Sequence, residues 1–181
     1  MSAPRVRSAV GSDLAPPLVE ELRTLLDAAF EGRFEDTDWA HALDGRHVWV
    51  EVGGRVVAHG SLVTRTLWHA GRPLRAGYVE AVGVAPDQQG RGRGAAVMGA
   101  LETSPGDHDV LALSSSEVGL GFYLRRGWVP WRGPTGVRAP HGDEPTPEDD
   151  GAVLLRPGRV PLAALDLDAD LWCDWREGDV W

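Results

Sequence analysis

The feature that most constrains this chain is a valine-rich segment that runs into a loop of glycine and arginine. The segment is Tyr78-Val79-Glu80-Ala81-Val82-Gly83-Val84, and the loop is Gln89-Gly90-Arg91-Gly92-Arg93-Gly94. An apolar pattern with helical spacing follows, from Ala95 to Leu101. A strand, a glycine turn and a helix in this order gather the unpaired N–H groups of the helix start, and glycine lets an anion approach the backbone. The sequence therefore predicts a site for a phosphate-containing ligand.

Two common phosphate-binding loops do not fit this segment. No Gly-Lys-Ser or Gly-Lys-Thr follows the glycines, so the loop is not a P-loop. The glycine spacing also departs from the dinucleotide fingerprint. Glycine-rich turns occur without any ligand as well, so the glycines alone leave a purely structural interpretation open.

The remaining patterns predict one mixed α/β sheet. We expect a helix from Pro16 to Phe30 and an acidic loop from Glu31 to Asp38. Three antiparallel strands in series should follow, at 48–52, 56–67 and 74–84, the first two joined by a turn at Gly53-Gly54. A buried strand at 110–113, a helix from about Ser116 to Gly127, and strands at 128–131 and 152–155 complete the pattern, with a loop at 132–151. This order predicts a single α/β domain over 1–181.

Composition limits the class of protein and its partners. With 181 residues, 43% of them hydrophobic, the chain can form one domain with a real core. It has no apolar run long enough for a membrane span, and residues 1–10 do not resemble a secretory signal. The lone Cys173 excludes an internal disulfide, so we expect a reduced, cytoplasmic setting and a packed thiol. Because no apolar run is long enough to span a membrane, we expect no membrane partner.

The net charge argues for a cationic partner. It is −9, and arginine supplies all the Lys+Arg positive charge because the chain contains no lysine. A protein that binds nucleic acid through phosphates normally carries a basic patch, so no nucleic acid is expected. Acidic clefts attract cations, although an acidic surface also serves solubility alone.

No metal site is expected. Glu148-Asp149-Asp150 has no histidine or cysteine nearby at ligand spacing. The six histidines, at 41, 47, 59, 69, 108 and 141, are scattered along the chain and show no cluster.

The glycine loop and its strand resemble motif A of the GNAT superfamily of acetyltransferases. Gln89, Gly92 and Gly94 fill the key places of the pattern Q/R-x-x-G-x-G/A. Phe122-Tyr123, followed by Arg125-Arg126-Gly127-Trp128, is similar to a second motif of that superfamily. The resemblance implies the GNAT fold, a mixed and largely antiparallel sheet flanked by helices and splayed at the strand that ends in Val84. It also implies acetyl-CoA as the cofactor.

Within that superfamily, the chain resembles the aminoglycoside 2′-N-acetyltransferases over nearly its whole length. The segments that carry the resemblance are Phe34, Thr37-Asp38-Trp39, Gly77-Tyr78-Val79-Glu80, Leu113-Ser114-Ser115-Ser116, Arg126-Gly127-Trp128, Pro130-Trp131, Gly133-Pro134-Thr135, Asp149-Asp150-Gly151 and Cys173-Asp174-Trp175-Arg176-Glu177-Gly178-Asp179-Val180-Trp181. The last of these is unusual enough that chance is a poor explanation. Aminoglycosides are polycations, which agrees with the acidic charge.

The resemblance implies roles for individual residues. The catalytic residues would be Glu80, which acts on the substrate amine directly or through water, Tyr123, which faces the coenzyme sulfur, and Trp181, through a terminal carboxylate. The cofactor would be held by Val82, Gly83, Val84, Gln89, Gly90, Arg91, Gly92, Arg93 and Gly94. The substrate would contact Asp38, Glu80, Ala81, Ser114, Glu148, Asp149, Asp179 and Trp181.

Two positions depart from the family pattern. Arg33 stands where an acidic residue is usual, which puts the substrate range in doubt unless Glu35 or Asp36 substitutes. Ala81 replaces a residue that is often glycine.

The reaction implied is direct acetyl transfer in a ternary complex, in which a deprotonated amine attacks the thioester. Two alternatives stay open at this point, namely acetylation of another small-molecule or protein amine, and a coenzyme-A-binding module without catalysis. The resemblance is also compatible with a homodimer.

Overall fold

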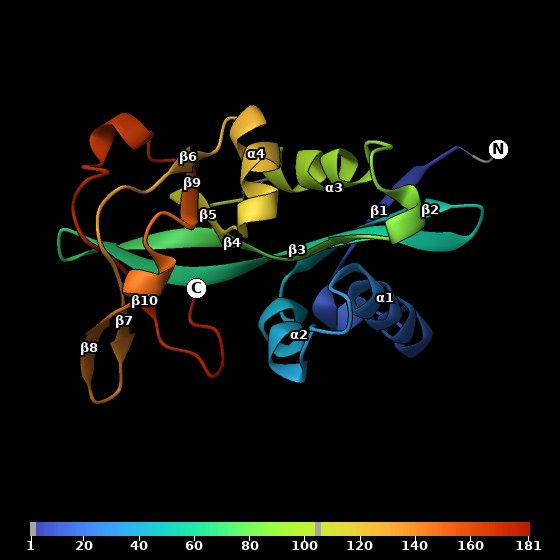
Figure 1. Ribbon diagram of the computed structural model, residues 1–181, viewed down its shortest axis with the longest axis horizontal. Coiled ribbons are helices and arrows are strands. Elements are labelled where there is room, and N and C mark those ends of the chain that lie inside the picture. Colours follow the sequence, from blue (N-terminus) through green and yellow to red (C-terminus); the bar gives the residue numbers. More distant parts are fainter. Residues whose placement is uncertain (1–2, 104–105) are drawn as a thin grey trace. The chain divides into compact units, whose positions relative to one another are not determined.

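The computed structural model describes residues 3–103 and 106–181 (Figure 1). The chain divides into two compact units, the first formed by residues 1–63 and 79–104 and the second by residues 64–78 and 105–181. The long strands β3 (Arg55–His69) and β4 (Arg72–Val84) supply residues to both units. The expectation of a single domain stays a prediction.

The first unit is a small sheet with helices on both faces. It contains β1 (Arg5–Val10), α1 (Pro16–Ala29), α2 (Asp36–Leu43), β2 (Arg46–Val52), α3 (Arg93–Glu102) and the adjoining parts of β3 and β4. Short 3₁₀ turns lie at Gly11–Asp13 and Pro86–Gln88. β1 pairs antiparallel with β2, and β2 pairs antiparallel with β3 around the Gly53-Gly54 turn.

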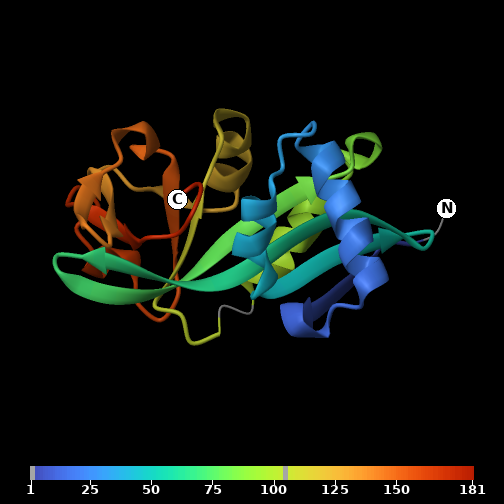
Figure 2. The same cartoon turned by 90° about the horizontal axis from the view of Figure 1, so that it is seen from below.

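Two glycines show how closely the helices of the first unit pack on its strands. A Cβ at Gly83 would lie 2.9 Å from Leu26 of α1. A Cβ at Gly60 would lie 2.9 Å from Val97 of α3, so the two helices cover opposite faces (Figure 1). In Figure 2, α1 and α2 lie in front of the strands of this unit. Leu22, Leu26 and neighbouring buried side chains fill the α1 face, as the helical spacing predicts.

The second unit contains most of the chain after α3. It comprises β5 (Val110–Ser114), α4 (Glu117–Arg125), β6 (Val129–Pro130), β7 (Thr135–Ala139), β8 (Gly142–Pro145), β9 (Val153–Pro157) and β10 (Leu171–Asp174), with 3₁₀ turns at Pro147–Asp149 and Leu162–Ala164. The ladder between β4 and β5 is parallel and runs from Ala76–Val110 to Tyr78–Ala112. β9 pairs antiparallel with β5 and β6, while β10 joins β3 antiparallel and β7 parallel.

The strands follow the order β6-β9-β5-β4-β3-β10-β7-β8, with β2 on β3 and β1 on β2. Among the described residues, the β4–β5 and β7–β10 pairs are parallel, and most of the other strand pairs are antiparallel. The predicted mixed, largely antiparallel sheet is therefore confirmed.

Two local predictions were wrong, and two strands were not predicted. The acidic segment 31–38 is not all loop, because α2 begins at Asp36. The predicted loop 132–151 contains the hairpin β7–β8, whose Pro-, Gly- and Asp-rich composition hides a strand pattern. β1 and β10 were not predicted at all, and both are short strands close to the ends of the sequence.

Candidate functional site

The glycine loop opens helix α3 as predicted. Gly92 is the N-cap residue with φ 74°, and Gly90 has φ 70°. Both lie in the left-handed region, which glycine enters without strain. A Cβ at either position would meet nothing within 4 Å, so the space above the loop is open. The first N–H groups of a ten-residue helix lie at this opening, which suits an anion.

The arginines of the loop support an anion site. The Nε atom of Arg93 is buried and has no hydrogen-bond partner among the described residues. Arg91 is exposed. The Gln89 side chain reaches back to the Val84 carbonyl oxygen at 3.5 Å, which orders the entrance of the loop. Arg93 is the first residue of α3, and a buried guanidinium nitrogen without a partner in the described part of the chain, on a residue at a helix start, fits the pyrophosphate of coenzyme A.

Gly83 has a packing role that the sequence did not reveal. Its missing side chain makes room for Leu26 and Ala29 of α1. The main chain of Val82, Gly83 and Val84 forms the end of β4, just before the loop.

Glu80 lies one residue before a strained point of β4. Its side chain is half-buried. The next residue, Ala81, has φ 50°, a left-handed conformation that is unusual for a residue with a Cβ. The Ala81 carbonyl oxygen lies 2.9 Å from Nδ1 of His59. A left-handed residue within a strand redirects the chain, as in a β-bulge, and such residues are frequent next to active sites.

Asp38 and the residues before it organise the start of α2. Asp38 Oδ2 accepts a hydrogen bond of 2.8 Å from the Glu35 N–H, as part of a capping box. Asp36 forms a 2.6 Å ion pair with Arg23. Arg33 is exposed and lies 3.2 Å from Glu31. A substrate role for Asp38 stays a prediction, and the capping contact is a structural role that the sequence analysis did not identify.

Trp181 is folded into the second unit. Its side chain is 2% exposed, and the indole N–H donates to the Thr146 hydroxyl at 2.9 Å. Its main-chain oxygen accepts hydrogen bonds from the Tyr78 hydroxyl at 2.8 Å and from Arg176 at 2.9 Å. Asp179 accepts a hydrogen bond from the Trp181 N–H at 3.0 Å. The segment before Trp181 is thus held in place.

Acidic side chains gather near this residue. Burial, followed by the negative charges of Asp179 and Glu148, raises the pKa of Asp149 to about 6. Burial and like charges at short range both disfavour ionisation of a carboxyl group, and a cation held beside it would favour ionisation. The structure therefore brings together Glu148, Asp149, Asp179 and Trp181, which the sequence analysis placed on the substrate.

Ser114 and Tyr123 also belong to the second unit. Ser114 ends β5, opposite Val153 of β9. Tyr123 lies on α4 and packs edge-on against Phe122 and Trp128, with centroids 5.1 and 6.2 Å away. These contacts fix the ring.

Sequence reasoning missed a pair of histidines. The histidines are scattered along the sequence, but two of them meet in the fold, since Nδ1 of His47 and Nε2 of His59 lie 2.9 Å apart. The predicted hairpin gave no signal for this pair. In the register that starts with Val52–Arg55 and Glu51–Val56, the two rings would face opposite sides of the sheet. The irregularity between Val50 and Glu51 shifts the register by one residue and brings both rings to one face.

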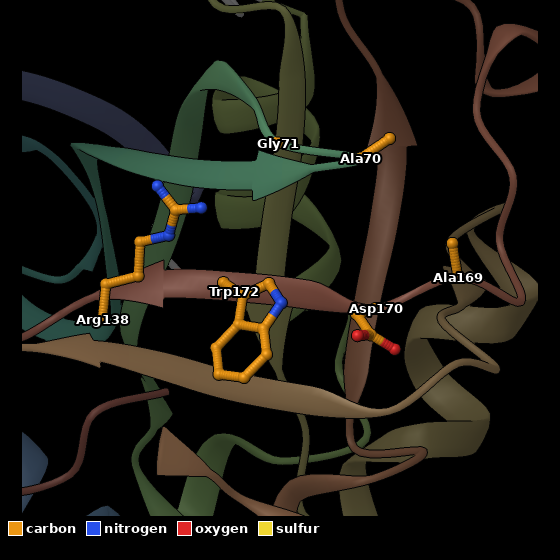
Figure 3. A pocket seen from close by; sticks show the side chains of 6 residues that line it. All are labelled: Ala70, Gly71, Arg138, Ala169, Asp170 and Trp172. Carbon is orange, nitrogen blue, oxygen red and sulfur yellow. The ribbon is translucent and has the colours of Figure 1, made fainter. Parts of the chain in front are cut away.

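Other features lie apart from the predicted site residues. A hollow of about 370 Å³ in the second unit is lined by Ala70, Gly71, Arg138, Ala169, Asp170 and Trp172, none of which was predicted to bind a ligand or take part in catalysis (Figure 3).

The single cysteine is packed, as expected. Burial raises the pKa of the Cys173 thiol to about 11, and the thiol donates to the Val180 carbonyl oxygen, so this expectation is confirmed. Within 3–103 and 106–181, no group of three or more His, Cys, Asp or Glu residues could hold a metal ion. In the same residues, every helix is too short or too polar to cross a membrane.

Comparison with known proteins agrees with this geometry. The family described as "Acetyltransferase (GNAT) domain" matches residues 14–130. An aminoglycoside 2′-N-acetyltransferase of Mycolicibacterium fortuitum is 45% identical over 172 residues, which are 94% of this chain and 88% of the relative. This match covers both units.

Solved structures share the fold. A GCN5-related N-acetyltransferase from Kribbella flavida is 26% identical with a TM-score of 0.57, over 72% of this chain. This chain spans only 34% of that protein's length. A GNAT family acetyltransferase from Brucella melitensis, solved in complex with acetyl-CoA, is 21% identical with a TM-score of 0.53, over 71% of this chain and 84% of the other. With its strand order, its glycine loop at α3 and these matches, the chain belongs to the GNAT acetyltransferase family.

Proposed function

We propose that this protein transfers the acetyl group of acetyl-CoA to the 2′-amine of aminoglycosides. The observation that carries the proposal is the group of Glu148, Asp149 and Asp179, in which burial, followed by the charges of Asp179 and Glu148, raises the pKa of Asp149 to about 6. An ammonium group bound there would relieve the repulsion and release a proton, so the site favours a polycation. The resemblance to the Mycolicibacterium fortuitum enzyme supports the same substrate class.

Acetyl-CoA supplies the activated acetyl group, and the first unit supplies its binding site. The N–H groups at the start of α3, together with Arg91 and Arg93, hold the pyrophosphate. Gly90, Gly92 and Gly94 let the phosphates approach the main chain, and Gln89 orders the entrance to the loop. The main chain of Val82, Gly83 and Val84 pairs with the pantetheine arm.

The remaining side chains move protons and orient the amine. Glu80 takes a proton from the substrate ammonium, directly or through water, because only the free amine is a nucleophile. Tyr123 returns a proton to the departing thiolate, and packing against Phe122 and Trp128 holds its ring for that task. Asp38, Ala81, Ser114 and Trp181 bind the substrate. Transfer is direct, without an acetylated enzyme. The protein works in the cytoplasm, as a homodimer.

The experiment is thiol release from acetyl-CoA in the presence of kanamycin-, gentamicin- and streptomycin-type substrates. Streptomycin lacks the relevant 2′-amine and serves as the internal control. Turnover with the 2′-amino compounds and none with streptomycin is expected. Equal turnover with streptomycin, or turnover only with other amines, would replace the proposed substrate class. Binding of acetyl-CoA without any turnover would indicate a module without catalysis.

Two variants separate the proton transfer from cofactor binding. Glu80→Gln removes the base and keeps the shape, so kcat should fall about 100-fold while the affinity for coenzyme A stays unchanged. Gly92→Asp puts a negative charge beside the pyrophosphate and should weaken coenzyme A binding at least about 100-fold, measured by calorimetry. Gly92→Asn, which tolerates the left-handed conformation equally well, is its matched neutral control and should lose much less.

A further inference from the structure

Two histidine rings form a buried pair in the first unit. His47 of β2 and His59 of β3 are fully buried, with ring centroids 5.1 Å apart. The strand register pairs His47 with Ser61 and Trp49 with His59, so the two rings are diagonal neighbours on one face. Trp39 of α2 lies against both rings, with centroid distances of 5.6 and 6.3 Å. The rings thus lie between the sheet and α2.

The pair links two main-chain carbonyls. His47 Nε2 lies 3.1 Å from the Leu43 oxygen, at the end of α2. His47 Nδ1 lies 2.9 Å from His59 Nε2, and His59 Nδ1 lies 2.9 Å from the Ala81 oxygen. All four ring nitrogens therefore take part in one continuous row of contacts.

The row is one proton short when both rings are neutral. A carbonyl oxygen only accepts, so each outer nitrogen needs a proton, and the contact between the rings needs another. That makes three protons, whereas two neutral imidazoles carry one each, two in total. Either the pair holds an extra proton, or one of its contacts lacks a hydrogen.

Burial favours the neutral pair at neutral pH. Desolvation lowers the pKa of both rings, and it lowers that of His59 to about 3, with the charge of His47 acting in the same direction. Among the described residues no carboxylate acts on the pKa of either ring. What faces the rings is Trp39 and the Ala42 and Leu43 carbonyls from α2, the Ala81 carbonyl from β4, and each ring from the other's strand. One contact must therefore go without its proton.

The strain at Ala81 decides which contact keeps its proton. A residue with a Cβ persists at φ 50° only where its surroundings hold it there. The His59 ring lies within hydrogen-bond distance of the Ala81 carbonyl oxygen, while the Leu43 contact is the longest of the three. We infer that His59 is a positioning residue for β4. Its Nδ1–H donates a hydrogen bond to the Ala81 oxygen, while its Nε2 accepts a hydrogen bond from Nδ1–H of His47.

This role of His59 affects both parts of the proposed active site that the first unit supplies, namely the base and the main chain that binds the pantetheine. Ala81 joins Glu80 to Val82, Gly83 and Val84, so its conformation sets the direction of the base and of the main chain next to the pantetheine. This consequence rests on the proposed function, whereas the protonation pattern of the two rings is independent of it.

The direct test is nuclear magnetic resonance of the full chain labelled with ¹⁵N-histidine, at pH 7. Loss of signals in His47→Asn and His59→Asn assigns the rings. We expect both rings neutral, with the proton on Nδ1. A proton on Nε2 of either ring, or both nitrogens of either ring protonated, would overturn the inference whatever the protein acetylates.

A matched pair of variants tests the role in β4. Asn and Leu have nearly the same shape, but only His59→Asn keeps a donor near the position of Nδ1. His59→Leu should lower kcat about tenfold or more with a 2′-amino aminoglycoside, and His59→Asn should stay within about threefold of the parent. Adding Ala81→Gly to His59→Leu should restore most of the loss, because glycine holds φ 50° unaided.

Equal losses for Asn and Leu, with no recovery in the double variant, would mean that His59 only fills space. If the parent protein shows no turnover at all, the same cycle is read from the affinity for coenzyme A and from thermal unfolding. A failure of the proposed substrate therefore leaves the test of His59 intact.

Discussion

Each unit contains a buried row of polar contacts. The two rows differ in whether the protons of their groups suffice to fill every contact. In the second unit the Trp181 indole N–H donates to Thr146, the Thr146 hydroxyl donates to Thr135 at 3.1 Å, and the Thr135 hydroxyl reaches Asp150 at 2.9 Å. Each donor has an acceptor, and a carboxylate ends the row. The row is complete with every group in its ordinary state.

The first unit has the opposite arrangement. Its row of Leu43, His47, His59 and Ala81 ends in carbonyls on both sides, so two neutral rings cannot satisfy it. The comparison shows that two buried rows of polar groups can have different properties. A row that ends in a carboxylate has one arrangement of protons and stabilises the fold. A row that is one proton short can adopt alternative tautomers and responds to pH.

Trp181 gives the largest expected effect. Trp181→Ala should lower the free energy of unfolding by about 3–5 kcal/mol, because it empties a fully packed site. Trp181→Phe keeps most of the packing and removes only the donor to Thr146, so it should cost about 1 kcal/mol. Urea denaturation measures both. A loss below about 1 kcal/mol for Trp181→Ala would mean that this segment does not pack in solution.

Acid should weaken the first unit through its histidines. A histidine whose pKa is lowered in the folded state stays neutral while the unfolded chain gains a proton, so stability is lost as the pH falls below about 6.5. With the pKa of His59 near 3, the loss between pH 7 and pH 5 should be about 2 kcal/mol.

The measurement for this effect is the free energy of unfolding of the parent and of His59→Asn across that range. The variant has no ring to titrate at this position, so its pH slope should be shallower. Thr135→Val, which breaks the closed row, should keep the parent slope. Parallel curves for the parent and His59→Asn would contradict the assignment.

Asp149 should show the reverse dependence. Its pKa is raised to about 6, so its contribution to stability is fully present below about 3.8 and is lost as the pH rises through 6. Asp149→Asn should therefore stabilise the protein at pH 8, by about 1 kcal/mol after allowance for solvent screening, and have little effect at pH 4. It should also weaken aminoglycoside binding.

Glu148→Gln serves as the control for this prediction. It removes one of the like charges and should lower the pKa of Asp149, as followed by carbon NMR of the carboxyl groups. An unchanged titration of Asp149 in this variant would show that Glu148 does not contribute to the shift, which would leave burial and Asp179 as its causes.

How much the sequence could predict depended on whether the pattern was local. The helix after Pro16 and the strands around Gly53-Gly54 followed from periodicity, and Gln89 to Gly94 marked the start of α3. α2 was missed because acidic residues suggested a loop, although Glu35 and Asp38 form a capping box. β10 has only four residues and obtains its partners, β3 and β7, from distant parts of the chain.

Site residues followed the same division. Residue types and motif spacing indicated the glycine loop, whereas the acids at 148, 149 and 179 followed only from the resemblance to the family. The histidine pair depends on strand register, and the row from Trp181 to Asp150 depends on tertiary packing. The left-handed conformation of Ala81 had one signal, the glycine that is usual at this position in the family, but the propensity of alanine disfavours the conformation and only the surrounding structure imposes it.

Ala81 offers the smallest expected effect and the finest test of the comparison. Its left-handed conformation costs about 1–2 kcal/mol for a residue with a Cβ. Glycine would remove that cost but would lose about 0.5–1 kcal/mol through the greater freedom of the unfolded chain. Ala81→Gly should therefore raise the free energy of unfolding by about 0.5–1 kcal/mol, a change that urea denaturation with replicate curves can resolve. Because glycine no longer needs the carbonyl to be held, removal of the His59 donor should also cost less in this background. If Ala81→Gly is destabilising, the strand does not hold a left-handed residue here, and the histidine row loses the strain that selects its tautomer.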